Sequence, residues 1–219
     1  MKMVAPLLAS LLAASACAIT STCASAGTFP TILNTSFDCA RASASIEKLI
    51  CRDPQLKRME IELTRLYRLV LTDDHSVPRP DKVEAEQRFW VLERNACASE
   101  AEPKACTIRS YAERAFQLRQ GSAIARTNDP SRLTEGPVAF RCEGLNALVA
   151  ATYFTVEPGV VYLKWANAST TLSQVPSEYA TLYRGKDSRG SYSFSQNGDE
   201  VFLQIPGSGQ MRCTAEPIG

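Results

Sequence analysis

The sequence contains almost no histidine. Of its 219 residues one is a histidine, His75, which lies in a polar segment beside Asp73 and Asp74. The chain has no Walker loop, no dinucleotide-binding glycine motif and no nucleophile-elbow pattern around a serine. The sequence therefore offers no motif for the usual nucleophilic and cofactor-dependent enzyme classes. We expect His75 to be a solvated loop residue, and we expect no catalytic residue and no cofactor.

Closely spaced metal ligands and an excess of positive charge are also missing. No C-x-x-C pair occurs, so a structural zinc site is not expected. Lysine and arginine number 24 against 23 aspartates and glutamates. The arginines of the first half are interleaved with acidic residues, which is typical of a surface rich in ion pairs. Without a basic face, nucleic acid is not an expected partner.

Paired carboxylates are the remaining candidates for catalysis. They occur at Asp73 and Asp74, at Glu84 and Glu86, and at Asp199 and Glu200. A glycosidase needs two carboxyl groups facing each other across a cleft, one of them with a raised pKa. The three pairs are expected in a turn, on a helix surface and in a hairpin, where carboxylates are ordinarily solvated. We therefore expect the protein not to be an enzyme.

The first 26 residues have the features of an export signal. Lys2 is followed by an apolar run from Val4 to Ala18, and Ala24-Ser25-Ala26 fits a cleavage site before Gly27. The run is too short and too small-sided for a good membrane span. Ala14-Ser15-Ala16-Cys17 loosely resembles a lipoprotein processing box but lacks the usual branched aliphatic residue. We expect a periplasmic or secreted protein, or an outer-membrane lipoprotein that contacts the membrane only if Cys17 is lipidated.

Cysteine usage agrees with export. Cleavage after Ala26 removes Cys17 and Cys23 and leaves six of the eight cysteines, an even number that implies disulfides in an exported chain. These are Cys39, Cys51, Cys97, Cys106, Cys142 and Cys213. A bridge from Cys142 to Cys213 would close most of the last third of the chain. Among the other four, the residues leave two pairings open: Cys51–Cys97 with Cys39–Cys106, and Cys39–Cys51 with Cys97–Cys106.

Residues 38–120 have the pattern of antiparallel helices. Asp53-Pro54 resembles an N-cap followed by proline at the first helical position. Asp81 and Glu84 have capping-box spacing for a second helix, and a third is expected from near Pro103 to Leu118. The inward positions recur at helical spacing; they are Leu56, Met59, Leu63, Leu66, Tyr67 and Val70, then Val83, Gln87, Trp90 and Val91, then Ile108, Tyr111, Ala112, Ala115 and Leu118.

The pattern then changes twice. Residues 121–137 have a linker composition, with Gly121-Ser122 and Gly136-Pro137 near its ends. From Val138 about eight short strands alternate with turns such as Asn197-Gly198-Asp199, which predicts a small barrel or sandwich. We therefore expect an α+β chain with a helical domain over residues 36–120, a linker over 121–137 and an all-β domain over 138–217.

The helical part resembles the LprI family, small exported helical domains with four cysteines. The matching segments are Ser36-Phe-Asp-Cys-Ala-Arg-Ala42, Ile46-Glu-Lys-Leu-Ile-Cys51, Asp53-Pro-Gln-Leu56, Gln87-Arg-Phe-Trp90, Arg94-Asn-Ala-Cys97, and Cys106 followed by Tyr111 and Arg114. The family takes its name from a mycobacterial lysozyme inhibitor.

The last third resembles the MliC-like inhibitors of C-type lysozyme. The matching segments are Phe140-Arg-Cys142-Glu-Gly144, Val161 to Trp165, Leu172, Tyr183, Gly198-Asp199-Glu200 and Met211-Arg-Cys213. The resemblance implies an eight-stranded antiparallel barrel with a cysteine near each end. It also implies a partner, C-type lysozyme or another peptidoglycan-cleaving enzyme, whose cleft a barrel loop would occlude. The alternative is a non-inhibitory adaptor of the envelope with a different protein partner.

The chain departs from the MliC pattern where partner contacts are expected. Members carry a Ser-Gly-x-x-Tyr loop and a lysine before a Gly-Asp-Glu turn. Here the loop reads Tyr179-Ala180-Thr181-Leu182-Tyr183, and Asn197 takes the position of the lysine. The residues that the resemblance places at the partner are Ser177, Tyr179, Ala180, Tyr183, Arg184, Lys186, Asn197 and Gly198, with Arg184 or Lys186 as substitute cations.

Overall fold

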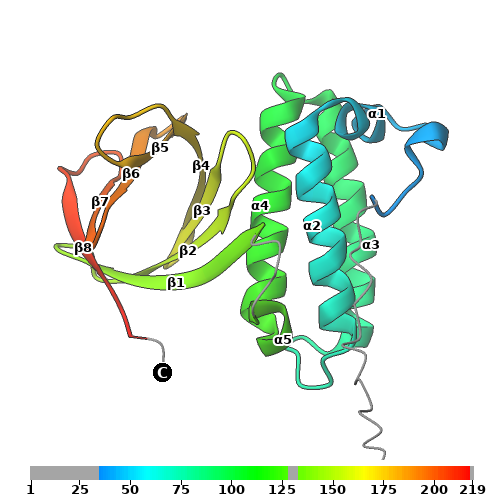
Figure 1. Ribbon diagram of the computed structural model, residues 1–219, viewed down its shortest axis with the longest axis horizontal. Helices are drawn as coiled ribbons and strands as arrows, with labels where there is room; N and C mark the ends of the chain where they lie inside the picture. The colour runs from blue at the N-terminus through cyan, green and yellow to red at the C-terminus, as the bar shows by residue number, and fades with distance from the viewer. Residues whose placement is uncertain (1–34, 128–132, 218–219) are drawn as a thin grey trace, which may run out of the picture. The chain divides into compact units, whose positions relative to one another are not determined.

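The fold class is α+β, with helices followed by a closed antiparallel barrel, which confirms the expectation (Figure 1). The computed structural model describes residues 35–127 and 133–217. These described residues belong to one compact unit. The expected signal segment, residues 1–26, and Cys17 lie outside the described residues. None of the helices in the described ranges combines the length and the apolar character that a membrane crossing requires.

The helical part begins with a short 3-10 turn. Its elements are η1 (Cys39–Arg41), α1 (Ser45–Arg52), α2 (Pro54–Leu71), α3 (Pro80–Ala96), η2 (Cys97–Ser99), α4 (Pro103–Gly121) and α5 (Ala123–Arg126). The Asp53 side chain accepts a hydrogen bond from the Leu56 amide at 3.0 Å, which confirms the expected N-cap of α2.

The start of α3 differs from the expected capping box. Its N-cap is Arg79, which makes no side-chain capping bond, and Pro80 is the first helical residue. Because the proline ring fixes φ at a helical value, the helix begins there and Asp81 lies inside the first turn. The capping-box interpretation of Asp81 and Glu84 was therefore wrong.

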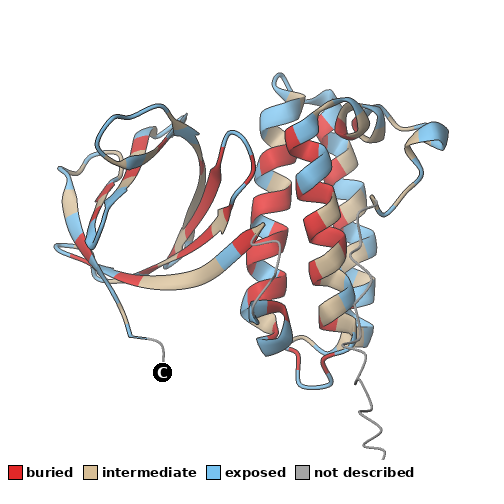
Figure 2. Ribbon diagram, in the orientation of Figure 1, coloured by how far each residue is buried: buried red, intermediate tan, exposed pale blue. Residues whose placement is uncertain are grey.

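Apolar side chains of α2 and α4 form the centre of the helical core, on the faces where Figure 2 shows buried residues. The expected positions on these helices that are buried are Leu56, Met59, Leu63, Leu66 and Val70 on α2, and Ile108, Tyr111, Ala112, Ala115 and Leu118 on α4. On α3, Val83 and Trp90 are buried, whereas Gln87 and Val91 are only half-buried.

A buried ion pair lies within this core. Arg94 of α3 and Glu60 of α2 each expose 2% of their side chains, and Nη1 of Arg94 lies 3.1 Å from Oε2 of Glu60. The same carboxylate accepts hydrogen bonds from the Tyr111 hydroxyl and from Ser36. Burial raises the pKa of Tyr111 well above its ordinary value. Several hydrogen bonds therefore replace the water that this carboxylate loses.

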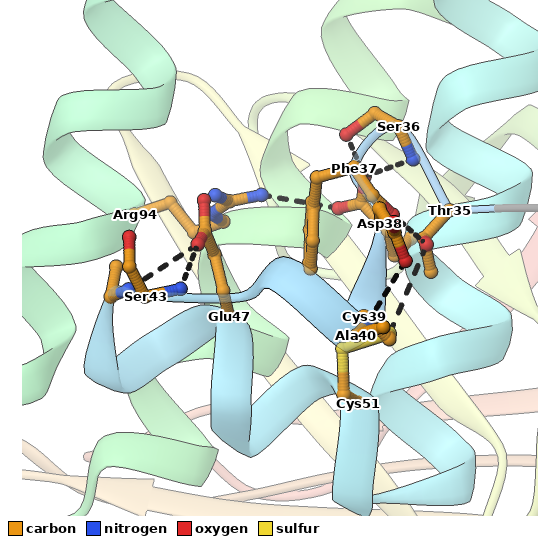
Figure 3. The surroundings of a disulfide bond; sticks show 12 residues. Thr35, Ser36, Phe37, Asp38, Cys39, Ala40, Ser43, Glu47, Cys51 and Arg94 are labelled. Carbon is orange, nitrogen blue, oxygen red and sulfur yellow. Dashed lines mark hydrogen bonds and ion pairs between the residues drawn. A yellow bond between two sulfur atoms is a disulfide. The ribbon is translucent and has the colours of Figure 1, made fainter.

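Two disulfides close short loops at the end of the helices where α2 begins and α3 ends. They join Cys39 to Cys51 and Cys97 to Cys106, so the structure has the local one of the two pairings. Figure 3 shows the first of them below Phe37, whose ring lies 5.8 Å from the guanidinium carbon of Arg94.

The other end of the helices is held without a covalent link. Asp73 is 4% exposed. Its carboxylate accepts hydrogen bonds from the Ser122 hydroxyl at 2.5 Å and from the His75 amide at 3.0 Å. The Ser122 hydroxyl lowers the pKa of Asp73. The expectation of a solvated Asp73 was wrong, because this residue joins the α2–α3 turn to the end of α4, while His75 itself is exposed as expected.

The barrel is an up-and-down sheet in which every strand pairs with its neighbours along the chain. The strands are β1 (Thr134–Cys142), β2 (Leu148–Phe154), β3 (Val160–Trp165), β4 (Ala168–Val175), β5 (Thr181–Asp187), β6 (Gly190–Asn197), β7 (Glu200–Gln204) and β8 (Met211–Ala215). Pairing of β1 with β8 closes the barrel, and it sets Cys142 opposite Cys213. These two residues form the third disulfide.

Helix α4 packs against the outer surface of the barrel. The ring of Phe116 lies 5.2 Å from that of Tyr162 on β3, and Phe154, Val156 and Val160 belong to the same hydrophobic cluster as the helices. The apolar core of the helical part therefore includes residues of the barrel sheet.

Arg119 of α4 adds polar contacts to this junction. It donates hydrogen bonds to the carbonyl of Gly136 at 2.6 Å and to the hydroxyl of Thr134 at 3.1 Å, and Thr134 in turn donates to Glu62. The expected linker, residues 121–137, contains helix α5 and the start of β1. Whether the parts on either side are separate folding domains stays a prediction.

Replacing Arg94 with methionine should destabilise the protein by about 3–5 kcal/mol, because the substitution leaves the Glu60 carboxylate buried without its cation. Urea unfolding followed by circular dichroism measures the loss. The control is Arg41→Ala, which breaks the exposed ion pair with Asp38 and should leave the unfolding midpoint unchanged. An unfolding midpoint of Arg94→Met equal to that of the wild type would contradict a stabilising role for the Arg94–Glu60 pair.

Phe116→Ala should lower the stability of both parts of the molecule by about 3–5 kcal/mol, because it opens a cavity in their shared core. The chain has two tryptophans, Trp90 in the helices and Trp165 in the barrel, so their indole NMR signals report on each part during urea unfolding. Both signals should disappear together and at lower urea than in the wild type. Loss of the Trp90 signal alone would mean that the barrel is stable without the helices.

Candidate functional site

The barrel has two rims, and the candidate residues lie mainly at one of them. Since neighbouring strands run antiparallel, the β2–β3, β4–β5 and β6–β7 connections share one rim and the remaining connections share the other. Thr181 pairs with Gln196. This pairing sets the β4–β5 loop, residues 176–180, beside the β6–β7 turn at Gly198 and Asp199.

Tyr179 is the most prominent side chain of the β4–β5 loop. It is 81% exposed, and Ser177 and Glu178 before it are also exposed, while Ala180 is half-buried. A large aromatic side chain on an exposed loop combines contact area with a hydroxyl that forms hydrogen bonds, as residues at protein interfaces often do. The loop therefore presents a large aromatic side chain to solvent.

Tyr183 has a different role. It is 7% exposed, and its ring centroid lies 6.2 Å from that of Tyr153 and 6.5 Å from that of Phe194. Burial raises the pKa of Tyr183. The tyrosine that the resemblance retains is thus a core residue that anchors β5 below the loop.

The β6–β7 turn is open to solvent. Asn197 pairs with Glu200, and Gly198 has φ +58 at the first central position of the turn. A positive φ at this position favours glycine, as in type II′ hairpin turns. No atom lies within 4 Å of the place where a Cβ of Gly198 would be. The exposed side chain of Asn197 is neutral, so the turn presents no cation at the position that the resemblance assigns to lysine.

Arg184 and Lys186 lie on the outer surface of β5, alternating with the inward Tyr183. Lys186 pairs with Ser191 beside the β5–β6 turn, at the opposite rim. From Thr181 to Lys186 the strand spans about 17 Å. The structure therefore does not bring Lys186 to the loop of Tyr179, and Arg184 lies part of the way between.

The carboxylate next to Lys186 has its own partners. Asp187 accepts hydrogen bonds from the Arg189 guanidinium at 2.6 Å and from the Tyr192 hydroxyl at 3.0 Å. The Arg189 guanidinium holds the pKa of Asp187 at about 2. Among the described residues, neither Arg184 nor Lys186 forms an ion pair, so both cations are available to a partner on this surface.

The acidic pairs of the sequence do not form a catalytic arrangement. Glu84, Glu86, Asp199 and Glu200 are all exposed, and Glu200 is paired with Arg212 at 2.9 Å. Within residues 35–127 and 133–217, no three histidine, cysteine or acidic side chains gather into a metal site.

Glu178 is a further exposed residue of the candidate loop, which the sequence analysis did not single out. It lies between Ser177 and Tyr179 and is exposed in the same loop. Its charge would repel the catalytic carboxylates of a glycosidase cleft and attract a cation on another surface. The sequence signal that could have identified Glu178 is its position between Ser177 and Tyr179, in the segment that the resemblance places at the partner.

Comparisons with known proteins found matches to two families. Residues 140–212 match the family model described as "Membrane-bound lysozyme-inhibitor of c-type lysozyme". Lipoprotein LprI of Mycobacterium bovis and Lipoprotein LprI of Mycobacterium tuberculosis are each 30% identical to the chain over 131 residues. The match covers 59% of this chain and 61% of each relative. No solved structure matches significantly. The chain therefore combines an LprI-like region with an MliC-like domain.

Proposed function

We propose that this protein is an exported inhibitor of C-type lysozyme, or of another peptidoglycan-cleaving enzyme, that occludes the enzyme's cleft with its β4–β5 loop. The observation that carries the proposal is the solvent exposure of Tyr179, in a barrel that matches the family of lysozyme inhibitors. The protein itself has no catalytic role in this proposal, because inhibition requires only binding.

The loop is supported in a way that suits insertion. Tyr183, Tyr153 and Phe194 pack together at its base, and the closed barrel limits movement of the strands that carry it. A loop that keeps one conformation loses less entropy on binding. Tyrosine is also among the residues that most often dominate binding energy at protein interfaces.

Electrostatic interactions contribute less to the proposed affinity for the enzyme than the MliC resemblance implies. Loss of one partner of a buried charge contact costs about 2–5 kcal/mol, and here Asn197 stands where a lysine is expected. Lysines and arginines nearly balance the acids over the whole chain, so long-range attraction to a charged enzyme is weak. Tyr179 would therefore supply much of the affinity.

An envelope location follows from the same proposal. The six cysteines of residues 35–217 are all paired in disulfides, which persist in oxidising compartments. The words "membrane-bound" and "lipoprotein" in the names of the family and the relatives agree with an exported protein of the cell envelope.

Tyr179→Ala should weaken inhibition about tenfold, because it removes the main apolar contact of the loop. The measurement is lysis of bacterial cell walls by C-type lysozyme with increasing amounts of the purified mature protein. The matched control is Leu148→Ala, which removes an apolar side chain that is 44% exposed on β2 near the opposite rim and should not alter inhibition. Absence of inhibition by the wild type at micromolar concentration would refute the proposal for this enzyme.

Asn197→Lys should strengthen inhibition by at least about tenfold if the cleft carboxylates lie near the β6–β7 turn, since each 1.4 kcal/mol changes affinity tenfold. The turn is solvent-exposed, so the substitution should not disturb folding. The same assay with Arg184→Ala and Lys186→Ala tests the outer surface of β5. A weaker effect of Asn197→Lys than of Lys186→Ala would place the partner on that surface.

A second function is favoured by the acidic Glu178 and the neutral Asn197. Both are unsuited to a cleft with catalytic carboxylates, and both suit an adaptor that binds a different envelope protein through the same rim. Immobilised mature protein and its Tyr179→Ala variant, each exposed to envelope extract, separate the two functions. Specific retention of a lysozyme-like enzyme alone would contradict the adaptor function.

A further inference from the structure

A groove runs between α3 and α4 in the helical part, away from the loops discussed above. Its volume is about 1030 Å³. The lining residues used below are Glu86, Phe89, Trp90, Glu93, Arg109 and Glu113. Val77 and Pro78 of the α2–α3 turn line it as well.

The groove presents one aromatic side chain, Phe89, to solvent. Phe89 is 69% exposed, although it is a large apolar residue. Trp90 is 8% exposed, and its indole nitrogen donates a hydrogen bond to the Ser110 carbonyl at 3.2 Å, which ties its ring to α4. Neighbouring residues on a helix point in different directions. Because Trp90 enters the core, Phe89 is left outside, and the adjacent pair in the sequence was the signal for this surface.

The charged groups at the base of the groove are already satisfied. Arg114 of α4 exposes only 3% of its side chain. It donates hydrogen bonds to Glu86 at 3.2 Å, to Gln87 at 3.0 Å and to Gln117 at 3.0 Å. This guanidinium therefore joins α3 to α4 and is not available to a ligand.

The accessible charges of the groove are mainly negative. Glu93 and Glu113 are exposed beside Arg109, the accessible cation among the lining residues, while Glu86 is already paired with Arg114. In the described part of the chain Glu93 forms no ion pair, and Glu113 lies against the Tyr162 phenol, whose pKa it helps to raise. The lining therefore has one carboxylate more than it has guanidinium groups, and an apolar surface with an excess carboxylate is complementary to an apolar side chain flanked by cations.

We propose that this groove is a docking site for a segment of a partner protein in which a bulky apolar side chain is flanked by lysine or arginine. The apolar side chain contacts Phe89 and the edge of Trp90, and a flanking cation pairs with Glu93. The site lies on α3 and α4 and does not include the β4–β5 loop. The proposal stands whether or not the barrel inhibits a lysozyme.

The charge of the groove argues against two other occupants. A second copy would bring two acidic surfaces together, and an anionic membrane would be repelled by the same carboxylates. Contact with a cationic segment removes this repulsion and covers Phe89 at the same time.

The test is calorimetric titration of the full mature chain with a short synthetic helix of leucine and lysine. Saturable binding that weakens as salt is added is the expected result. A counterpart peptide with glutamate in place of lysine should not bind. The indole NMR signal of Trp90 should move on binding, while that of Trp165 in the barrel stays in place.

Substitutions at two exposed residues of the groove test the proposed contact with the peptide. Phe89→Ala should weaken binding about tenfold, as truncation of an interface aromatic residue does, and Glu93→Gln should weaken it severalfold and reduce its salt dependence. The matched controls are Leu148→Ala, since Leu148 is 44% exposed on β2 and outside the groove lining, and Glu84→Gln on α3. Neither control should change the affinity.

Three outcomes would overturn the proposal. They are equal weakening by the controls, movement of the Trp165 signal in place of Trp90, and concentration-dependent dimers in sedimentation that Phe89→Ala abolishes. A chain that fails to inhibit lysozyme but binds the cationic peptide through Phe89 would refute only the barrel function.

Discussion

The contact of Arg119 with the first strand of the barrel holds the two parts of the molecule together. Arg119 is 4% exposed, and it donates hydrogen bonds to Gly136, Thr134 and Ala125. Because β1 pairs with both β2 and β8, the strand that α4 fixes is also the strand that closes the barrel. Burial of a guanidinium is favourable only when its donors find acceptors, so the surrounding chain is constrained to supply them.

This constraint relates the two candidate binding surfaces. Helix α4 carries Glu113 and Arg109 at the groove, and it also contacts the barrel through Phe116. The β4–β5 loop lies on the rim shared with the β2–β3 connection, where Pro158 accepts a hydrogen bond from Gln55 at 2.6 Å. A partner large enough to cover both surfaces would meet them on one connected framework.

Much of the fold could be predicted because local patterns express it directly. Asp53-Pro54, the apolar spacing of α2 and the alternation in β3 each depend on neighbouring residues. Burial of Arg94 could not be predicted, since a charged residue on an amphipathic helix ordinarily faces water and its partner Glu60 lies 34 residues away. At the candidate site, the exposed loop was predicted from resemblance, whereas the distance of Lys186 from it required the register of β5.

Closure of the barrel also determines how a partner can bind. An open sheet has edge strands whose free amide and carbonyl groups can accept an added strand from another protein. In this barrel β1 and β8 are each other's neighbours, and the Cys142–Cys213 disulfide joins them covalently. Closure therefore disfavours strand addition at the end of β1 that pairs with β8, and a partner reads mainly side chains at the rims or on the outer surface of the barrel.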